Sequence, residues 1–421
     1  MALNSPIPDP DALDAGDQLR QFRDQFVITD PEVCYLDGNS LGRLPRKTVE
    51  VVQRFLVEEW GSELVAGWSH WIDEAQRVGD VLGEIALGAS TGQVLTLDTT
   101  SVNLYQLCDA AIKANPDRNV VISDTANFPT DRYILEGLCE RHGKQLILID
   151  DESGEECVTA EMLKAHLSRD VALVTLSVVQ YRSGALHDVS TLTKLAHEVG
   201  ALVLWDASHA VGVVDMKFDR DEVDLAVGCT YKYCNSGPGS PAWLYVNKRL
   251  QESLQVPIQG WFAQRDQFAM GQGFDRAVGM RGFQIASPSI VGLRCVETSL
   301  SMIGEATLPA IAQKAATGTE LMFALHDEWL APLGFSTMTP RDASRRGGHI
   351  TMKHPDAKQI AVAMREFAKV IPDYREPSSI RVAISPLATS FREVYDGFER
   401  IRDLVTSGKY RGASMPTGRV T

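Results

Sequence analysis

The stretch "LWDASHAVGVVDMKFDRDEVDLAVGCTYKYCNSGPGS", residues 204–240, decides the fold. It contains two short apolar runs, and each gives way to polar residues: the first to Asp206 and His209, the second to Lys232. If the two runs are neighbouring parallel strands, their carboxyl ends meet at the edge where open α/β sheets bind ligands. Taken singly, Asp206 is as well explained as a helix N-cap and Lys232 as a solvated surface lysine. Together they predict a ligand site at that edge.

The same alternation of short β-rich runs and amphipathic helical stretches extends over most of the chain. Apolar stripes at helical spacing occur in "SVNLYQLCDAAIKA" and in "VSTLTKLAHEVG". This alternation is typical of α/β proteins with a parallel sheet. The runs predicted as strands are residues 94–98, 119–124, 144–150, 171–179, 201–208, 224–230 and 241–246. We therefore expect a seven-stranded, mostly parallel sheet in a large domain.

The pattern changes beyond about residue 300. Long helical stretches are separated there by the β-rich runs "GGHITMKH" and "SIRVAIS", which predicts a smaller α+β domain. A chain of 421 residues also exceeds what one hydrophobic core usually fills. We expect a large domain over residues 59–300, a small C-terminal domain over residues 301–421, and an N-terminal segment, residues 1–58, that packs with the small domain.

Composition and charge disfavour several classes of partner. The formal net charge of −14 argues against nucleic acid, and no apolar run is long enough to cross a bilayer. Seven scattered cysteines without C-x-x-C spacing and nine dispersed histidines predict neither a disulfide framework nor a metal site. The acidic, proline-rich start "MALNSPIPDPDALDAGD" is unlike a signal peptide. A cytoplasmic protein is therefore expected.

A lysine and an aspartate at adjacent strand ends are the pair that pyridoxal phosphate chemistry requires. The lysine amine forms a Schiff base with the cofactor, and the carboxylate keeps the pyridine nitrogen protonated, so that the ring accepts electrons. Phe128, in "NFPTDRY", could stack on a flat ring, and Thr100 and Ser101, in "DTTSVN", could hold a phosphate at a helix N-terminus. Core packing for Phe128 and simple helix capping for Thr100 and Ser101 are the alternatives.

Several motifs, in their order along the chain, resemble the class V branch of fold-type I pyridoxal-phosphate enzymes, and within it the kynureninase family. They are "YLDGNSLGRLP", "DTTSVNL", "NFPTDRY", "WDASHAVG", "GCTYKYCNSGPG", "GWF", "DYREP" and "IRVAISPL", which extend over nearly the whole chain. Two positions favour this family over the cysteine desulfurases of the same class: His209 stands where those usually carry glutamine, and Tyr231 where they carry histidine. A desulfurase also needs a cysteine nucleophile on a late loop, and the chain has none after Cys295.

The resemblance implies a role for each matched residue. Lys232 is the Schiff-base lysine, Asp206 the partner of the pyridine nitrogen, and Tyr231 a proton donor in the later steps. Arg381 would bind the substrate's α-carboxylate through a fork of two hydrogen bonds, the alternative being a surface arginine on a strand. The other implied cofactor contacts are Thr100, Ser101, Phe128, Pro129, Thr130, Asp131, Ser177, His209, Trp261 and Ser287. Of these, Trp261 and Ser287 would come from the partner subunit of a homodimer.

The resemblance further implies the reaction. The enzyme would cleave the Cβ–Cγ bond of L-kynurenine, and of its 3-hydroxy form, to give L-alanine and anthranilate or 3-hydroxyanthranilate, in tryptophan catabolism by the kynurenine pathway and NAD biosynthesis. Trp68 or Trp71 would wall the aryl pocket, with core packing as the alternative. Another enzyme of the same fold, an aminotransferase or a β-lyase, and a non-catalytic ligand sensor remain alternatives. The sequence leaves open which form of the substrate is preferred.

Overall fold

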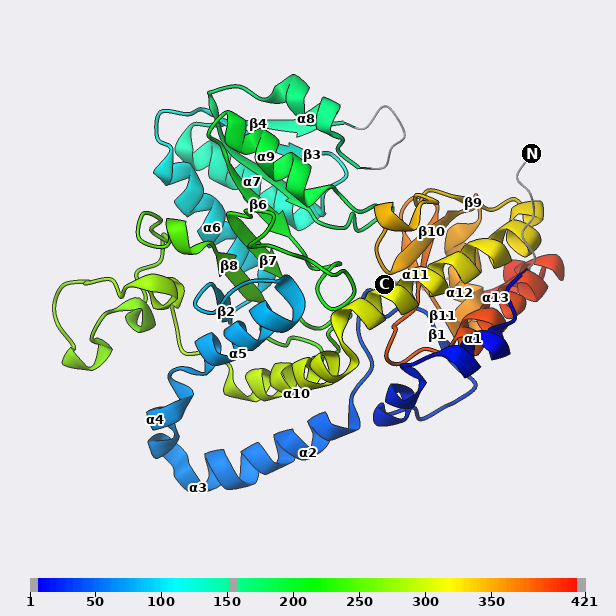
Figure 1. Cartoon of the computed structure of the whole chain (residues 1–421). Helices are drawn as coiled ribbons and strands as arrows, with labels where there is room; N and C mark the ends of the chain where they lie inside the picture. Colours follow the sequence, from blue (N-terminus) through cyan, green and yellow to red (C-terminus); the bar gives the residue numbers. More distant parts are fainter. Residues whose placement is uncertain (1–6, 151–156, 415–421) are drawn as a thin grey trace.

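The computed structural model describes residues 7–150 and 157–414 and places the seven predicted strands in one sheet (Figure 1). The strand order is β2-β8-β7-β6-β5-β3-β4. Every neighbouring pair from β7 to β4 is parallel, whereas β8 is antiparallel to both β7 and β2. The strands are β2 (Val94–Thr96), β3 (Val120–Asp124), β4 (Gln145–Ile149), β5 (Val171–Ser177), β6 (Leu202–Asp206), β7 (Leu225–Gly228) and β8 (Trp243–Val246). The prediction of a seven-stranded, mostly parallel sheet is confirmed.

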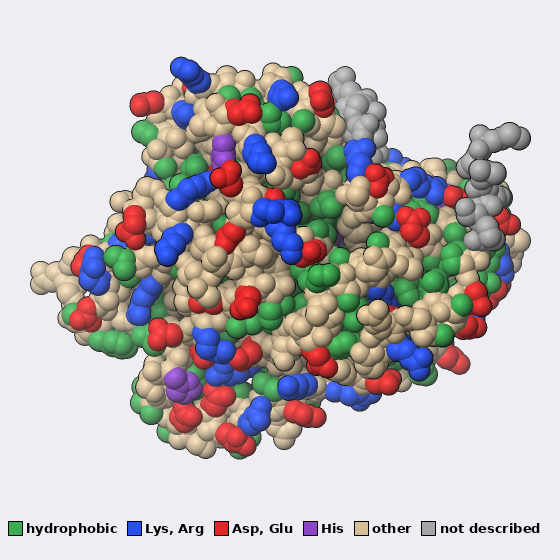
Figure 2. Space-filling model, viewed as in Figure 1, with side chains coloured by type: hydrophobic (Ala, Val, Ile, Leu, Met, Phe, Trp, Pro, Cys, Tyr) green, Lys and Arg blue, Asp and Glu red, His purple; other side chains and the backbone are tan. Residues whose placement is uncertain are grey.

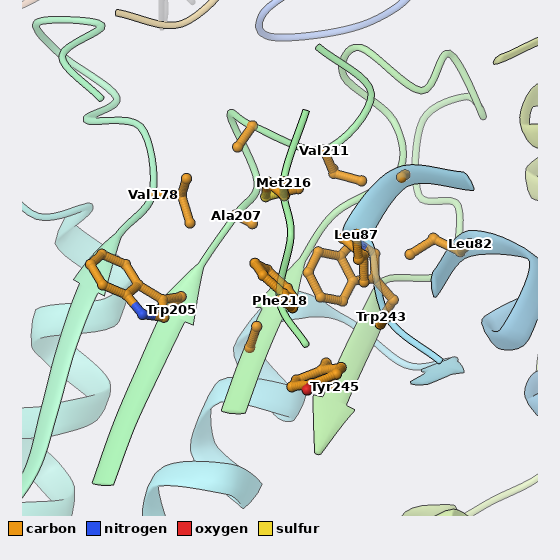
Figure 3. Close-up of a cluster of buried hydrophobic side chains, with 14 of the residues drawn as sticks. Leu82, Leu87, Val178, Trp205, Ala207, Val211, Met216, Phe218, Trp243 and Tyr245 are labelled. Carbon is orange, nitrogen blue, oxygen red and sulfur yellow. The ribbon is translucent and has the colours of Figure 1, made fainter. Parts of the chain in front are cut away.

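Both faces of this sheet are buried, because alternate side chains of each strand pack against helices on opposite sides. In β6, Val203 and Trp205 belong to one hydrophobic cluster and Leu204 to the other. The first face, seen in Figure 3, brings Trp205, Trp243 and Tyr245 together with Leu82 and Leu87. The helices on the first face are α5 (Glu74–Leu82), α8 (Ala160–His166), α9 (Val189–Glu198) and α10 (Ile290–Ala306); those on the second are α6 (Thr100–Ala114) and α7 (Pro129–His142).

A four-stranded antiparallel sheet, in the order β12-β13-β10-β9, forms the C-terminal part of the chain. Its strands are β9 (Ser336–Thr337), β10 (His349–Lys353), β12 (Asp373–Arg375) and β13 (Ser379–Ala383), and its helices are α11 (Leu308–Leu325), α12 (Ala357–Phe367) and α13 (Phe391–Thr406). The helices and strands predicted for this region therefore form, in the predicted order. Their apolar side chains build a separate hydrophobic cluster.

The first N-terminal elements, α1 (Pro10–Gly16) and β1 (Cys34–Tyr35), pack against this C-terminal part. They are followed by α2 (Arg46–Arg54). β1 pairs in parallel with β11 (Val370–Ile371), and Cys34 and Leu36 lie within the C-terminal hydrophobic cluster. Asp14 accepts hydrogen bonds from two backbone N–H groups at the start of α13. The segment that follows β1 then reaches the loop of Lys232, while α2 packs on α10.

Two segments extend away from the rest of the molecule (Figure 1). Both expose hydrophobic side chains. One continues from α2 through the short helices α3 (Gly61–Glu63) and α4 (Trp68–Trp71). The other is the excursion between β8 and α10, which contains only short helical turns. Figure 2 shows hydrophobic side chains at the surface on this side of the molecule. The large exposed ones in the two segments are Leu56, Val57, Trp60, Leu64, Val65, Ile258, Trp261, Phe268, Met270, Phe274 and Val278.

Candidate active site

Lys232 lies on the loop that follows β7. In this loop Asn235 has a φ of +60°, and its N–H donates to the carbonyl oxygen of Lys232 at 2.9 Å. The N-terminal segment closes on the same loop, because the N–H of Gly42 donates to the carbonyl oxygen of Tyr231 at 2.7 Å. A Cβ atom on Gly42 would lie 2.4 Å from the carbonyl oxygen of Lys232, so only glycine allows this approach. The lysine backbone is thus fixed from two sides.

The side chain of Lys232 points toward the end of β6. Its Nζ lies 2.9 Å from Nε2 of His209, whose ring is buried. Burial is the main cause that lowers the pKa of Lys232. Burial, followed by the charge of Lys232, lowers the pKa of His209 well below its ordinary value. A neutral imidazole beside an amine with a lowered pKa leaves that amine able to act as a nucleophile or a base.

Two buried carboxyl groups face each other at the same edge of the sheet. Asp206 ends β6, and Asp131 lies in the first turn of α7, after Pro129 and Thr130. Burial raises the pKa of Asp131 well above its ordinary value, and the charge of Asp206 and a hydrogen bond with it add to this, while Lys232 acts in the opposite direction. The raised pKa of Asp131 lets its carboxyl group hold a proton beside Asp206, and the pair attracts a cationic group. After Asp206 the chain turns without forming a helix, so the N-cap alternative for this residue is wrong.

Ser177 and Phe128 are joined through Asn127. Ser177 ends β5, and its Oγ donates to Oδ1 of Asn127 at 2.7 Å. The same oxygen accepts the N–H of Phe128 at 2.8 Å. The half-buried ring of Phe128 meets Tyr181 edge-on, with the ring centroids 5.3 Å apart. The ends of β3, β5 and β6 thus place a serine, an aromatic ring and the carboxyl pair along one edge.

Thr100 and Ser101 open α6, whose N-cap is Thr99. Oγ1 of Thr99 accepts the N–H of Val102 at 3.3 Å, so neither Thr100 nor Ser101 is the capping residue. Thr100 is half-buried and Ser101 is exposed. Their N–H groups lie in the first turn of the helix, where backbone N–H groups have no carbonyl partner within the helix. The positive end of the helix dipole is at the same turn. A phosphate fits such a helix end.

Tyr231 lies next to the lysine amine. Nζ of Lys232 is 5.9 Å from the centroid of the Tyr231 ring. Burial, followed by the neighbouring thiol of Cys229, raises the pKa of the Tyr231 phenol. The phenol therefore stays protonated near neutral pH and is able to donate a proton.

Arg381 is buried on β13, with its side chain 1 % exposed, so the alternative of a surface arginine is wrong. Its Nε donates to Oδ2 of Asp373 at 2.5 Å, and Nη2 also pairs with this carboxylate. Nη1 donates to the carbonyl oxygen of Tyr181 at 2.5 Å, and Nη2 to Oγ of Ser40 at 3.1 Å. The fork that the resemblance assigns to a substrate is thus directed at Asp373 in this structure.

Three of the predicted site residues belong to the two exposed segments and the start of α10. The ring of Trp68 packs against Trp71 and Phe262. Trp261 is 47 % exposed, and Ser287 is exposed just before α10. Within the described part of the chain we find no contact that joins these three residues to the lysine cluster. Trp71 is buried in the hydrophobic core, which agrees with the alternative of core packing for this residue.

No group of three or more His, Cys, Asp or Glu side chains in residues 7–150 and 157–414 is placed to hold a metal ion. No helix in the same ranges has the length and apolar content needed to span a bilayer.

Comparison with known proteins decides the family. Residues 311–401 match the model of the kynureninase C-terminal domain. Over 403 residues, 94% of each chain, the sequence is 36% identical to a kynureninase from Pseudomonas fluorescens. Over 414 residues it is 36% identical to a kynureninase from Burkholderia pseudomallei, covering 96% of this chain and 97% of the relative. The chain belongs to the kynureninase family.

Solved structures share the fold of this kynureninase family member. An apo cysteine desulfurase from Thermococcus onnurineus NA1 superposes with a TM-score of 0.80 at 16% identity, covering 92% of this chain and 98% of the other. A C-DES mutant with glycine covalently linked to its PLP cofactor gives a TM-score of 0.79 at 16% identity, covering 90% and 99%. At this identity the likeness shows the fold alone. It confirms the expected fold-type I architecture.

The cluster also fits pyridoxal phosphate, the cofactor expected from the resemblance to kynureninases. Oδ2 of Asp131 and Nδ1 of His209 are buried without a hydrogen-bond partner among the described residues. Unpaired buried polar atoms are costly, so a bound group that pairs with them is favoured. A cationic ring nitrogen would suit the carboxyl pair of Asp131 and Asp206. The amine of Lys232 and the start of α6 suit the aldehyde and the phosphate.

Several residues at this site were not identified from the sequence. Ser40 and Asp373 both contact Arg381, and both lie in motifs that the resemblance had already marked, "YLDGNSLGRLP" and "DYREP". Tyr181 acts through its backbone carbonyl, for which a sequence carries no signal. His349 lies in the predicted strand "GGHITMKH", but only the tertiary structure brings it beside His209, with ring centroids 5.5 Å apart.

Proposed function

We propose that the chain is a pyridoxal phosphate-dependent kynureninase. It hydrolyses the Cβ–Cγ bond of L-kynurenine, and of 3-hydroxykynurenine, to L-alanine and anthranilate or 3-hydroxyanthranilate. The observation that carries this proposal is the cluster of Lys232, His209 and the carboxyl pair Asp206 and Asp131 at one sheet edge, in a chain 36% identical to curated kynureninases over nearly its whole length.

The bound cofactor supplies an electron sink that stabilises negative charge on the substrate carbon next to the amine. Lys232 would hold it covalently, and Asp206, supported by Asp131, would hold its ring nitrogen. The other residues that would surround it are Thr100, Ser101, Phe128, Pro129, Thr130, Ser177 and His209, with Trp261 and Ser287 of the neighbouring subunit.

The protein's own side chains move the protons. The amine of Lys232, with its lowered pKa and with His209 2.9 Å away, takes the proton from Cα of the substrate. Water adds to the γ-carbonyl carbon, the Cβ–Cγ bond breaks, and Cβ takes up a proton, for which the protonated phenol of Tyr231 is the donor. The amine of Lys232 returns a proton to Cα, which completes L-alanine. Arg381 anchors the α-carboxylate and so orients Cα toward the lysine.

We also propose that the protein is a homodimer with shared active sites. Trp261 is exposed on the excursion, and Trp68 packs against its neighbour Phe262. The surface with the exposed hydrophobic side chains therefore also carries predicted site residues that do not reach the Lys232 cluster of the same chain. Contiguous exposed hydrophobic surface of this kind marks protein interfaces. A second copy that covers it would bring Trp261 and Ser287 to the partner's phosphate, and Trp68 to an aryl pocket.

Three further assignments complete the proposal. Residues 59–300 form the cofactor-binding domain and residues 301–421 the small domain, with residues 1–58 as an N-terminal segment. The pairing of β1 with β11 joins this segment to the small domain, while its helix α2 packs on α10. The enzyme acts in the cytoplasm. It serves tryptophan catabolism by the kynurenine pathway and so NAD biosynthesis.

Product analysis tests the proposed reaction. Purified protein is incubated with pyridoxal phosphate and L-kynurenine, and the products are identified by mass spectrometry. Equal amounts of anthranilate and alanine are expected. An aminotransferase would leave the Cβ–Cγ bond intact, and a non-catalytic ligand sensor would return kynurenine unchanged. Either result would overturn the proposal.

A further inference from the structure

His349 is a fully buried histidine that the proposed mechanism does not use. It is 0% exposed at the start of β10. Neither ring nitrogen has a hydrogen-bond partner of normal geometry among the described residues, and the carbonyl of Tyr181 is the backbone group that acts on the ring. Leaving both nitrogens of a buried imidazole unpaired costs stability. A buried polar side chain of this kind, next to a ligand site, indicates a partner that arrives with the ligand.

The fold aims His349 at the site. β10 and β13 are antiparallel, and their register pairs His349 with Ala383 and Thr351 with Arg381. Because side chains alternate along a strand, His349 and Arg381 share one face of the sheet as diagonal neighbours. On that face the His349 ring lies 5.5 Å from the ring of His209, which contacts Lys232.

Gly184 leaves the space that the imidazole occupies. Its φ is +78°, and a Cβ atom there would lie 2.7 Å from the carbonyl oxygen and 3.2 Å from Nε2 of His349. Any other residue would push the strand or the ring away. The loop of the large domain and the strand of the small domain thus fit together around this histidine.

The charges around His349 keep it neutral and favour an anion. Burial is the main cause that lowers its pKa well below the ordinary value, and Arg381, Lys232 and Arg375 lower it further, while the carbonyl of Tyr181 acts in the opposite direction. A neutral imidazole offers one N–H donor. It does so beside Arg381 and Arg375, whose charges favour a carboxylate although both also pair with Asp373.

Arg381 has little donor capacity left for such a carboxylate. Of its five N–H groups, Nε and one on Nη2 serve Asp373, a second on Nη2 serves Ser40, and one on Nη1 serves the carbonyl of Tyr181. One N–H on Nη1 remains among the contacts of the described residues. A carboxylate bound here with two hydrogen bonds therefore needs a donor from another side chain.

We propose that His349 is that donor: it hydrogen-bonds the α-carboxylate of the amino-acid substrate beside the remaining N–H of Arg381. The assignment rests on the proposed function, because it takes the substrate to be an α-amino acid bound at Lys232. His349 is then a substrate-binding and specificity-determining residue that selects ligands with a free carboxylate.

The test compares L-alanine, the proposed product, with L-alaninamide, which lacks the carboxylate. Binding of each to the holoenzyme is followed by the change in visible absorption of the cofactor. His349→Leu should weaken alanine binding about 10- to 100-fold and leave alaninamide binding unchanged, the range expected for a hydrogen bond to a charged group. His349→Gln, which keeps a donor, should recover part of the loss. KM for kynurenine should rise more than kcat falls.

Stability separates this role from a structural one. Because His349→Leu removes unpaired polar atoms from the core, its urea midpoint should not fall, whereas loss of a packing residue would lower it. His326→Leu, at another buried histidine whose Nδ1 contacts Asp327 at 2.8 Å, is the matched control and should leave the preference for alanine intact.

The inference would be overturned if His349→Leu weakened the binding of alanine and alaninamide equally, or left alanine binding unchanged. It would also be overturned if the wild-type protein bound alanine no more tightly than alaninamide. The proposed function can fail independently. If the wild-type protein does not cleave kynurenine, but His349→Leu still abolishes the preference for alanine over alaninamide, the carboxylate site stands and the proposed reaction is wrong.

Discussion

Replacing Arg381 by alanine should destabilise the whole protein as well as weaken substrate binding. Arg381 and Asp373 are each 1 % exposed, and removing one partner of a buried ion pair costs about 3–5 kcal/mol. Arg375 offers a matched control, because it pairs with the same carboxylate at 2.9 Å while 35% of its side chain is exposed. Exposed pairs contribute about 0–1 kcal/mol. Arg375→Ala should therefore cost several-fold less free energy than Arg381→Ala.

Equilibrium urea unfolding of the apoproteins, followed by far-UV circular dichroism, measures both costs. The double variant Arg381→Ala with Asp373→Ala completes the cycle, and its cost should fall short of the sum of the single variants by about 1–3 kcal/mol, because the two residues are in contact. A loss of activity alone would not separate substrate binding from folding. The reasoning about the buried ion pair would be refuted if the losses of unfolding free energy in the two single variants simply added up in the double variant. It would also be refuted if Arg381→Ala were no less stable than Arg375→Ala.

Three other variants test separate parts of the site. Burial, followed by the charge of Asp373, raises the pKa of Asp37 to about 6, so the folded state loses stability as the pH rises through that value. Asp37→Asn should raise the free energy of unfolding by about 1–3 kcal/mol at pH of about 7.5 and by little near pH 4, and a pH-independent difference would contradict this. Asp206→Asn should retain the cofactor but lower kcat roughly 10²- to 10³-fold, and near-normal turnover would remove Asp206 from its proposed role. Trp261→Ala should weaken dimerisation in sedimentation experiments and cofactor retention together, and a monomer with full cofactor occupancy would argue against shared sites.

The large sheet could be predicted because its strands are covered on both faces. Such strands carry nearly continuous hydrophobic runs, which the sequence displays directly. The convergence of Asp206 and Lys232 followed from the same reasoning, since the carboxyl ends of parallel strands share an edge. The register pairs Asp206 with Val227 of β7, just before the loop that carries the lysine.

The environment of Arg381 was only partly accessible from the sequence. Asp373 lies directly opposite Arg381 in the antiparallel pair of β12 and β13, so recognising "DYREPSSIR" as a hairpin would have revealed the ion pair. The contacts of Tyr181 and His349 depend instead on how the two sheets meet. These contacts join residues far apart in the chain, and local patterns do not encode them.

The central claim is that Lys232 holds the cofactor, and chemical trapping tests it most directly. Sodium borohydride reduces the imine between a lysine and pyridoxal phosphate to a stable amine, and peptide mass spectrometry then locates the modified residue. We expect the modification on Lys232, near full occupancy, and none in Lys232→Ala protein that still has the wild-type circular dichroism spectrum. Modification of another lysine, such as the buried Lys314, or an unmodified Lys232 in a protein that retains the cofactor, would contradict the account.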